Sequence, residues 1–295
     1  MLVSRGQIMQ NALSFDVEEY FHVSAYSDRV RPEDWLSYPS RVGRSVDKIL
    51  ELLDQHSCRA TFFSLGWIAE NSPEVIRRIA DCGHEIACHS FSHRRVFDMT
   101  PVAFRDDTRH AKELLEEVSG TSVRGYRAPS FSITSNSQWA FEILAELGFA
   151  YDSSIFPVRH PNYVMLTAPR SPFRVDTHCG PIVEFPMPTL AFGRTRAPFG
   201  GGAYLRLLPY GYTRWGIHYI NRTENRPVCV YLHPWEVDAE QPRMQGNLTA
   251  RVRHYFGLRR TEVKLKRLLE DVEFCPLGTL VEQLIPKGAN IPAHA

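Results

Sequence analysis

The sequence predicts an α/β protein built on a parallel sheet with helices outside it, closed as a barrel or left open. Two observations predict this. Strand-like runs alternate with helix-like runs through the first half of the chain, and polar residues follow directly after several of the strand-like runs. Repeated β-α units bring parallel strands together, and the carboxyl ends of those strands form the edge at which such proteins build their sites.

Short apolar runs predict the strands, at residues 12–15, 60–63, 85–88, 123–126, 149–151, 182–185 and 228–232. Apolar runs of this length, bounded by turn residues, are typical of buried parallel strands. Residues 157–209 are rich in Pro, Gly and Arg, so apart from 182–185 they are predicted to form loops.

Helices are predicted over 41–56, from Pro73 to before Gly83, from Pro101 to before Gly120, over 138–147, and from about 248 to 272. The first carries apolar residues at helical spacing. A proline in the first turn and a glycine after the last are typical helix boundaries. We expect one domain over residues 11–285, with a C-terminal elaboration over about 190–285 and a disordered tail at 286–295.

The composition is that of an ordinary globular protein. The 295 residues are 43% hydrophobic and 23% charged, with a net charge of +1, so nothing indicates binding to nucleic acid or to an anionic membrane. No run reaches transmembrane length, and residues 1–6 lack the apolar stretch of a secretory signal. Six cysteines without a C-x-x-C pair predict structural thiols in a reducing compartment, and hence the cytoplasm.

Two histidines four residues apart, His89 and His93, stand at the end of a predicted strand. Four residues are about one helical turn, so both imidazoles are expected on one face, where they could bind one metal ion. Imidazole is a common zinc ligand. The pair alone is a weak signal, because 12 histidines produce such spacings by chance. Glu18 adds a possible third ligand.

The other candidate residues also follow predicted strands: Asp16 and Glu18 the first, His89 and His93 the third, Arg127 the fourth, Asp152 the fifth and His233 the last. Scattered surface residues would not sort in this way, so the sequence predicts a single site at the carboxyl edge of the sheet.

The chemistry of these residues suits a mononuclear metal hydrolase. One carboxylate and two imidazoles leave positions open for water and a substrate oxygen, as in catalytic rather than structural sites. Asp16 lies two residues before Glu18, so in an extended segment both side chains face the same way and Asp16 could accept the proton of the water. His233 is the natural donor to a departing amine.

Five motifs, in order, resemble those of the polysaccharide deacetylases with the NodB homology domain, which include chitin and peptidoglycan deacetylases. They are SFDVE at 14–18, GHEIACHSFSH at 83–93, RAP at 127–129, DSS at 152–154 and LHP at 232–234. The resemblance runs from about residue 12 to residue 236, and 60–66 is similar to a strand typical of the family. It implies a distorted (β/α) barrel.

The resemblance also implies a role for each site residue. Asp16 would be the catalytic base, oriented by Arg127, and His233 the acid, oriented and tuned by Asp152. Glu18, His89 and His93 would hold a divalent metal, Zn²⁺ first, with Co²⁺, Ni²⁺ or Fe²⁺ as alternatives. The metal and the backbone N–H of Ser130 would hold the oxyanion.

One motif departs from the family pattern. Typical members have two adjacent aspartates, base then ligand, whereas this chain has Val17 second and glutamates third and fourth. The third ligand is therefore Glu18 or Glu19, and strand alternation favours Glu18. The segments 19–22, 233–236 and 200–202 look like those of exopolysaccharide deacetylases associated with exosortases.

The expected function is metal-dependent removal of N-acetyl groups from a polysaccharide or its lipid-linked precursor, in exopolysaccharide biosynthesis. The expected partners are an N-acetylated glycan and, peripherally, membrane-bound exopolysaccharide synthesis machinery. A first alternative keeps the chemistry but acts on a small cyclic imide or ureide. A second is a carbohydrate-binding protein without catalysis, against which the intact base, acid and ligands argue.

Overall fold

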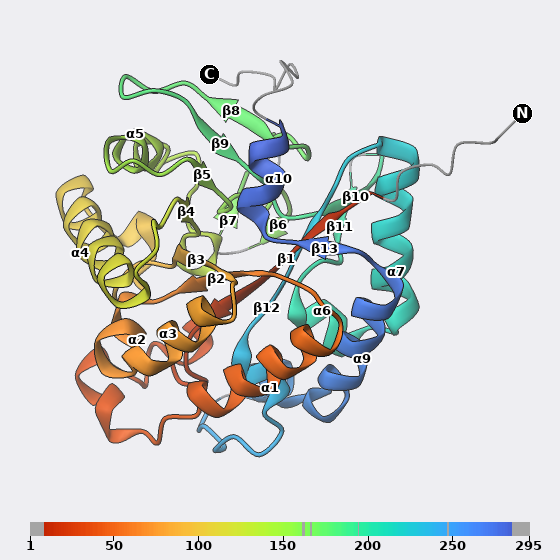
Figure 1. The fold of residues 1–295 in the computed structure, drawn as a ribbon, viewed down its shortest axis with the longest axis horizontal. Helices are drawn as coiled ribbons and strands as arrows, with labels where there is room; N and C mark the ends of the chain where they lie inside the picture. The colour runs from red at the N-terminus through yellow and green to blue at the C-terminus, as the bar shows by residue number, and fades with distance from the viewer. Residues whose placement is uncertain (1–8, 161–162, 166, 194, 247, 285–295) are drawn as a thin grey trace, which may run out of the picture.

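The computed structural model describes residues 9–160, 163–165, 167–193, 195–246 and 248–284. Its centre is a curled, mostly parallel sheet (Figure 1), whose strands lie in the order β12-β1-β2-β3-β4-β5-β9-β8, with β13 also paired to β1. Only the β8–β9 pairing within this sheet is antiparallel. The predicted α/β fold is confirmed, and the sheet has the form of a half-barrel.

The sheet strands are β1 (Asn11–Val17), β2 (Thr61–Ser64), β3 (Glu85–Cys88), β4 (Gly125–Tyr126), β5 (Tyr151–Asp152), β8 (Phe173–Val175), β9 (Ile182–Glu184), β12 (Cys229–Leu232) and β13 (Phe274–Cys275). All seven predicted strands are present, each within two residues of its expected bounds. Every residue of β1, β2 and β12 is buried, as expected of strands that are covered on both faces.

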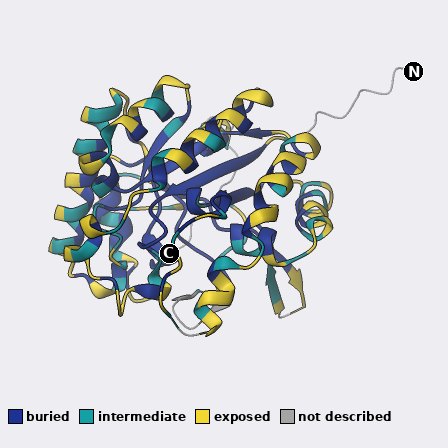
Figure 2. Ribbon diagram, turned by 90° about the horizontal axis from the view of Figure 1, so that it is seen from below, coloured by how far each residue is buried: buried dark blue, intermediate teal, exposed yellow. Residues whose placement is uncertain are grey.

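The helices are α1 (Val42–Gln55), α2 (Gly66–Asn71), α3 (Pro73–Asp81), α4 (Pro101–Ser119), α5 (Trp139–Glu146), α6 (Gly202–Leu207), α7 (Tyr210–Tyr219), α8 (Leu248–Tyr255), α9 (Leu258–Asp271) and α10 (Leu277–Leu284). They lie around the sheet with exposed outer faces, while the strands are buried (Figure 2). The expected helix over 248–272 is divided in two at Gly257, whose φ is +81° and where an added Cβ would lie 2.8 Å from the Arg206 carbonyl oxygen.

Local sequence explains the boundaries of α4. The Thr100 side chain accepts a hydrogen bond from Ala103 N at 3.2 Å, as an N-cap does. At the other end Gly120 adopts φ +67°, the left-handed conformation that costs glycine least. An N-cap of this kind is worth about 1 kcal/mol. The same logic places Gly83 and Gly148, with φ of +75° and +80°, after α3 and α5.

Residues 157–209 are more ordered than expected. Besides β8 and β9 they contain two small hairpins, β6 (Arg159–His160) with β7 (Tyr163–Val164) and β10 (Thr189–Phe192) with β11 (Thr195–Pro198). The helices α2, α6, α7 and α10 and strand β13 were not predicted either. The expected disordered tail at 286–295 lies outside the described residues.

All six cysteines are unpaired, and Cys58, Cys88, Cys229 and Cys275 are buried, whereas Cys82 and Cys179 are exposed. Among the described residues, none of the helices combines the length and the hydropathy needed to cross a membrane.

Candidate active site

Five of the seven predicted site residues line one cavity at the carboxyl edge of the sheet. The cavity has a volume of about 220 Å³, and the five are Asp16, Glu18, His89, His93 and His233. The other two predicted residues, Arg127 and Asp152, are fully buried and do not line it.

Glu18, His89 and His93 form a group that could hold a metal ion, because one ligand atom of each lies within 4.8 Å of the others. His93 Nε2 lies 2.7 Å from Glu18 Oε2. That oxygen is buried without a hydrogen bond of good geometry, although the other carboxylate oxygen accepts one from Trp235 Nε1 at 3.0 Å. A buried, unsatisfied carboxylate oxygen is costly, and a cation would satisfy it. The donor set therefore fits a metal.

His89 is held in the form that a metal ligand needs. Its Nδ1 lies 2.7 Å from the backbone oxygen of Arg127, so Nδ1 carries the proton and donates, which leaves Nε2 as the free acceptor. Burial lowers the pKa of His89 to about 4, outweighing the nearby Asp16 and Glu18. The ring is therefore neutral at physiological pH.

The histidine pair does not lie on a helix, contrary to the spacing argument. The residues after β3 form a loop in which Ser90 and His93 have φ of +69° and +53°. Asp107 fixes this loop by accepting hydrogen bonds from Phe91 N and Ser92 Oγ, both at 2.8 Å. Left-handed conformations at non-glycine residues are costly and cluster at functional sites. The two rings still converge, with centroids 5.5 Å apart.

The two adjacent glutamates point to different places. Glu18 faces the cavity, whereas Glu19 caps helix α1: its carboxylate accepts hydrogen bonds from Ser40 Oγ and from the backbone N–H groups of Arg41 and Val42, at 2.5 to 3.1 Å. Only Glu18 belongs to the group with His89 and His93, in agreement with the alternation argument.

Asp16 lies at the end of β1 beside a buried arginine. Its Oδ1 accepts from Arg127 Nη1 at 2.6 Å, and its Oδ2 lies 4.0 Å from His233 Nε2. Arg127 is itself fixed by Ser14 Oγ and the backbone oxygen of Ser153, at 2.9 and 3.2 Å. Such a network holds the Asp16 carboxylate in one orientation, with the other oxygen directed toward the cavity.

The partner of His233 is Glu236 and not Asp152. His233 Nδ1 lies 2.7 Å from Oε1 of Glu236. The other oxygen of the Glu236 carboxylate, Oε2, accepts a hydrogen bond from Arg206 Nε at 2.5 Å. Burial alone would lower the pKa of His233, but the negative charges of Glu18, Glu236 and Asp16 raise it to about 9. These carboxylates therefore favour the protonated ring that a proton donor requires.

The expectation that Asp152 orients His233 is therefore wrong. Asp152 accepts hydrogen bonds from the backbone and side chain of Ser154, at 3.2 and 2.6 Å. It also pairs with Glu184 across the β5–β9 register. Burial raises the pKa of both carboxyls, and Asp152 raises that of Glu184 further. The Asp152–Glu184 pair belongs to the interior of the sheet. Ser154 Oγ also accepts a hydrogen bond, at 2.8 Å, from the backbone N–H of Ala128, the residue after Arg127.

Sequence reasoning did not single out Glu236 or Arg206 as site residues. The signal for Glu236 was its position three residues after His233, because a 3₁₀ turn (Pro234–Val237) brings positions i and i+3 together. Arg206 carried no such signal, because it reaches Glu236 from helix α6.

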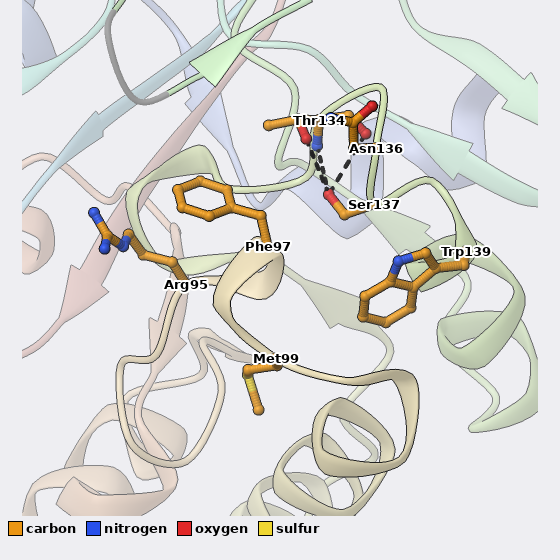
Figure 3. A pocket seen from close by; sticks show the side chains of 7 residues that line it. All are labelled: Arg95, Phe97, Met99, Thr134, Asn136, Ser137 and Trp139. Atoms are coloured by element: carbon orange, nitrogen blue, oxygen red, sulfur yellow. Dashed lines mark hydrogen bonds between the residues drawn. The ribbon is translucent and has the colours of Figure 1, made fainter.

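A second depression, of about 430 Å³, lies between the turn Val96–Asp98 and the start of α5 (Figure 3). It is lined by Arg95, Phe97, Met99, Thr134, Asn136, Ser137 and Trp139. None of these is an acid, a histidine or a cysteine, so this depression lacks the groups that a hydrolytic centre requires.

Known proteins match parts of this chain in sequence and share its fold. Residues 35–151 match the family model described as polysaccharide deacetylase, and residues 153–282 match one described as a domain of unknown function, DUF3473. The first of these segments, less than half of the chain, is therefore similar to polysaccharide deacetylases. Both matched segments contribute strands to the one sheet.

Among individual proteins, a peptidoglycan-N-acetylglucosamine deacetylase from Bacillus cereus is 36% identical over 96 residues, which are 32% of this chain and 35% of that protein. The chain thus matches about a third of the length of that relative. A solved Mycobacterium smegmatis structure, described as a polysaccharide deacetylase, superposes with a TM-score of 0.67 at 20% identity, over 100% of this chain and 96% of that one. The Puue allantoinase superposes with a TM-score of 0.61 at 14% identity, over 98% of each chain. At these identities both structures show the shared fold alone.

Proposed function

We propose that this protein is a metal-dependent hydrolase that removes N-acetyl groups from a polysaccharide or from its lipid-linked precursor, in exopolysaccharide biosynthesis. The observation that carries the proposal is the cavity that contains the Glu18–His89–His93 group together with two further catalytic candidates, Asp16 and His233. The segment similar to polysaccharide deacetylases and the B. cereus relative support the acetamide as the bond that is cleaved.

Glu18, His89 and His93 would hold a divalent cation. Two imidazoles and one carboxylate favour Zn²⁺, with Co²⁺, Ni²⁺ and Fe²⁺ as alternatives. When bound, the ion would supply Lewis-acid chemistry at the acetamide carbonyl and acidify water.

The remaining steps belong to side chains of the site. Asp16, held by Arg127, accepts the proton of the attacking water. His233, held through Nδ1 by Glu236, donates a proton from Nε2 to the departing amine, so that a neutral amine rather than an amide anion leaves. The backbone N–H of Ser130, in a residue that lines the cavity with φ +55°, would stabilise the oxyanion. Base and acid then act from different parts of the sheet edge, Asp16 in β1 and His233 directly after β12.

Metal analysis paired with an acetate-release assay tests the proposal. Purified protein should contain about one divalent ion per chain, and it should release acetate from N-acetylhexosamine oligomers. Chelation should abolish the release and added Zn²⁺ should restore it. Oligomer hydrolysis that survives complete metal removal would contradict the metal-dependent mechanism.

The small cavity volume favours a second candidate function, hydrolysis of a small cyclic imide or ureide. At about 220 Å³ the cavity lies below the roughly 300–1,000 Å³ of pockets that hold drug-sized ligands. A panel of such compounds, assayed beside the oligomers, separates the two: activity on a cyclic amide without acetate release from any sugar would replace the leading proposal.

The proposed partners are an N-acetylated glycan and, peripherally, the membrane-bound machinery that makes exopolysaccharide. Six unpaired cysteines support a reducing compartment, and we propose the cytoplasm. Fractionation of cells that express the tagged protein tests both the compartment and the association.

A further inference from the structure

The cavity is surrounded by a complete ring of contacts, which we call the rim. The rim consists of the turn Ser24–Tyr26, the turn Pro129–Phe131, Tyr231 at the end of β12, helix α6 and helix α8. Each of these elements contributes at least one residue to the cavity lining. The shape of the cavity therefore depends on how these elements are joined.

One half of the rim is joined by a hydrogen bond, a ring contact and a backbone bridge. Ser24 Oγ and Ser130 Oγ are 2.5 Å apart, which ties the first turn to the second. The Phe131 and Tyr231 rings meet edge to face with centroids 5.0 Å apart. Tyr231 in turn bridges to Gly201, the residue directly before α6, where an added Cβ would lie 2.8 Å from the tyrosine ring.

The other half is joined through a buried arginine and a histidine. Arg206 of α6 donates to the backbone oxygens of Arg253 and His254 at the end of α8, at 3.1 and 3.2 Å. The His254 ring then contacts the Tyr26 ring, with centroids 5.3 Å apart. Because Tyr26 belongs to the turn Ser24–Tyr26, this contact connects α8 to the element from which the series of contacts began. The rim is closed.

The region next to the acid is also filled. The rings of His233, Trp235 and His254 stack in sequence, with centroids 5.0 and 4.3 Å apart and interplanar angles of 21° and 16°. Trp235 and His254 are buried, so these rings fill the space next to His233. Among the lining residues Ala25 and Arg253 are exposed, so the cavity opens to solvent beside them.

We propose that the site accepts a single acetamido sugar unit, at the end of a glycan chain or alone on a carrier, and excludes the interior units of a polymer. The proposal rests on the deacetylase function proposed above. An interior unit is joined to neighbours on both sides, so its chain must leave the site in two directions. The small volume of the cavity, about 220 Å³, and the contacts that join the elements around it favour one direction only, past Ala25 and Arg253.

Mapping the deacetylated position tests this proposal. The metal-loaded full chain is incubated with N-acetylhexosamine oligomers of increasing length, labelled at the reducing end, and the products are sequenced by mass spectrometry. We expect the loss of one acetyl group, from a terminal unit, at every length. Deacetylated interior units would overturn the single-unit proposal and leave the deacetylase function intact. Failure to release acetate from any sugar, with a cyclic amide hydrolysed, would overturn both.

A substitution at the mouth gives an independent test. Ala25→Trp places a large side chain where the substrate must enter, and it should lower kcat/KM for terminal-unit deacetylation. The matched control, Arg29→Trp, changes an exposed residue of the same segment that does not line the cavity. Thermal melting and metal content show whether both variants are folded and loaded. Equal kcat/KM values for the two variants would show entry elsewhere and contradict the closed rim.

Discussion

Glu236 holds His233 by its ring: the carboxylate oxygen Oε1 lies 2.7 Å from Nδ1, and the same oxygen accepts the backbone N–H of His233 at 3.1 Å. Because Arg206 occupies the other carboxylate oxygen, the pair has little freedom. This contact keeps a proton on Nδ1 and orients the ring, so that Nε2 points toward Asp16 and Glu18 in the cavity and can deliver the second proton of the charged ring.

Glu236→Gln should therefore lower kcat for acetamide hydrolysis by about a hundredfold, the lower range of a lost general acid. The metal content should be unchanged, and an aryl acetate, whose phenolate leaves without a proton, should lose much less activity. Glu240→Gln, at an exposed glutamate that pairs with Arg44, is the control. Equal losses on both substrates would indicate a general structural defect, which thermal melting would reveal.

Asp16→Asn should reduce acetate release by at least about a hundredfold, because an amide cannot accept the proton of water. Stability should also fall, by about 3–5 kcal/mol, since Arg127 would remain as a buried charge without its partner. Urea unfolding and acetate release measure the two effects. The control is Asp98→Asn, at an exposed aspartate paired with Arg95. Wild-type turnover in Asp16→Asn would exclude Asp16 as the base.

The neighbouring glutamates provide a matched pair for the metal. Glu18→Gln should lose most of the bound ion, whereas Glu19→Gln should keep it and instead destabilise the start of α1 by about 1 kcal/mol, the value of a helix cap. Elemental analysis and thermal melting separate the two outcomes. The opposite pattern would assign the third ligand to Glu19.

Acid should destabilise the protein through His84, which is remote from the cavity. Burial lowers the pKa of this ring to about 4 from 6.5, and Ala60 N donates to its Nδ1 at 3.2 Å. As the pH falls, His84 therefore takes up a proton in the unfolded chain before it does so in the folded protein. The stabilising contribution is complete above pH 6.5 and is lost as the pH falls toward about 4.

His84→Gln keeps an acceptor for Ala60 N but does not titrate. Its free energy of unfolding should fall less than that of the wild type between these pH values, when measured by urea unfolding. His178→Gln, at an exposed histidine, is the control. Parallel curves for wild type and His84→Gln would show that the decline arises elsewhere.

The elements that the sequence predicted well are those with local causes. The apolar stripe of α1 was visible in spacing alone, and Val42, Val46, Ile49, Leu50 and Leu53 are all buried in the structure. Helix α4 begins and ends at its own cap residues. The edge at which the site residues gather followed from their places after successive strands.

What the sequence did not predict depends on contacts between distant segments. Asp152 lies at the end of a strand, as expected, yet its side-chain partners are Ser154 and Glu184. Helix α6 exists within a stretch that reads as loop, because Gly202 allows the Glu236 carboxylate to approach: an added Cβ would lie 2.0 Å from Oε1. No local pattern records such an approach.

The position of the rim elements in the sequence also determines the order in which the parts of the site are synthesised. The three candidate metal ligands all lie within residues 18–93, directly after strand β1 or in the loop after strand β3, and are synthesised early. Helix α8, which completes the wall through His254 and Tyr26, begins only at Leu248. A growing chain thus acquires the residues that can bind an ion long before it acquires the wall that restricts access to them, so selectivity for the substrate is the last property of the site to form.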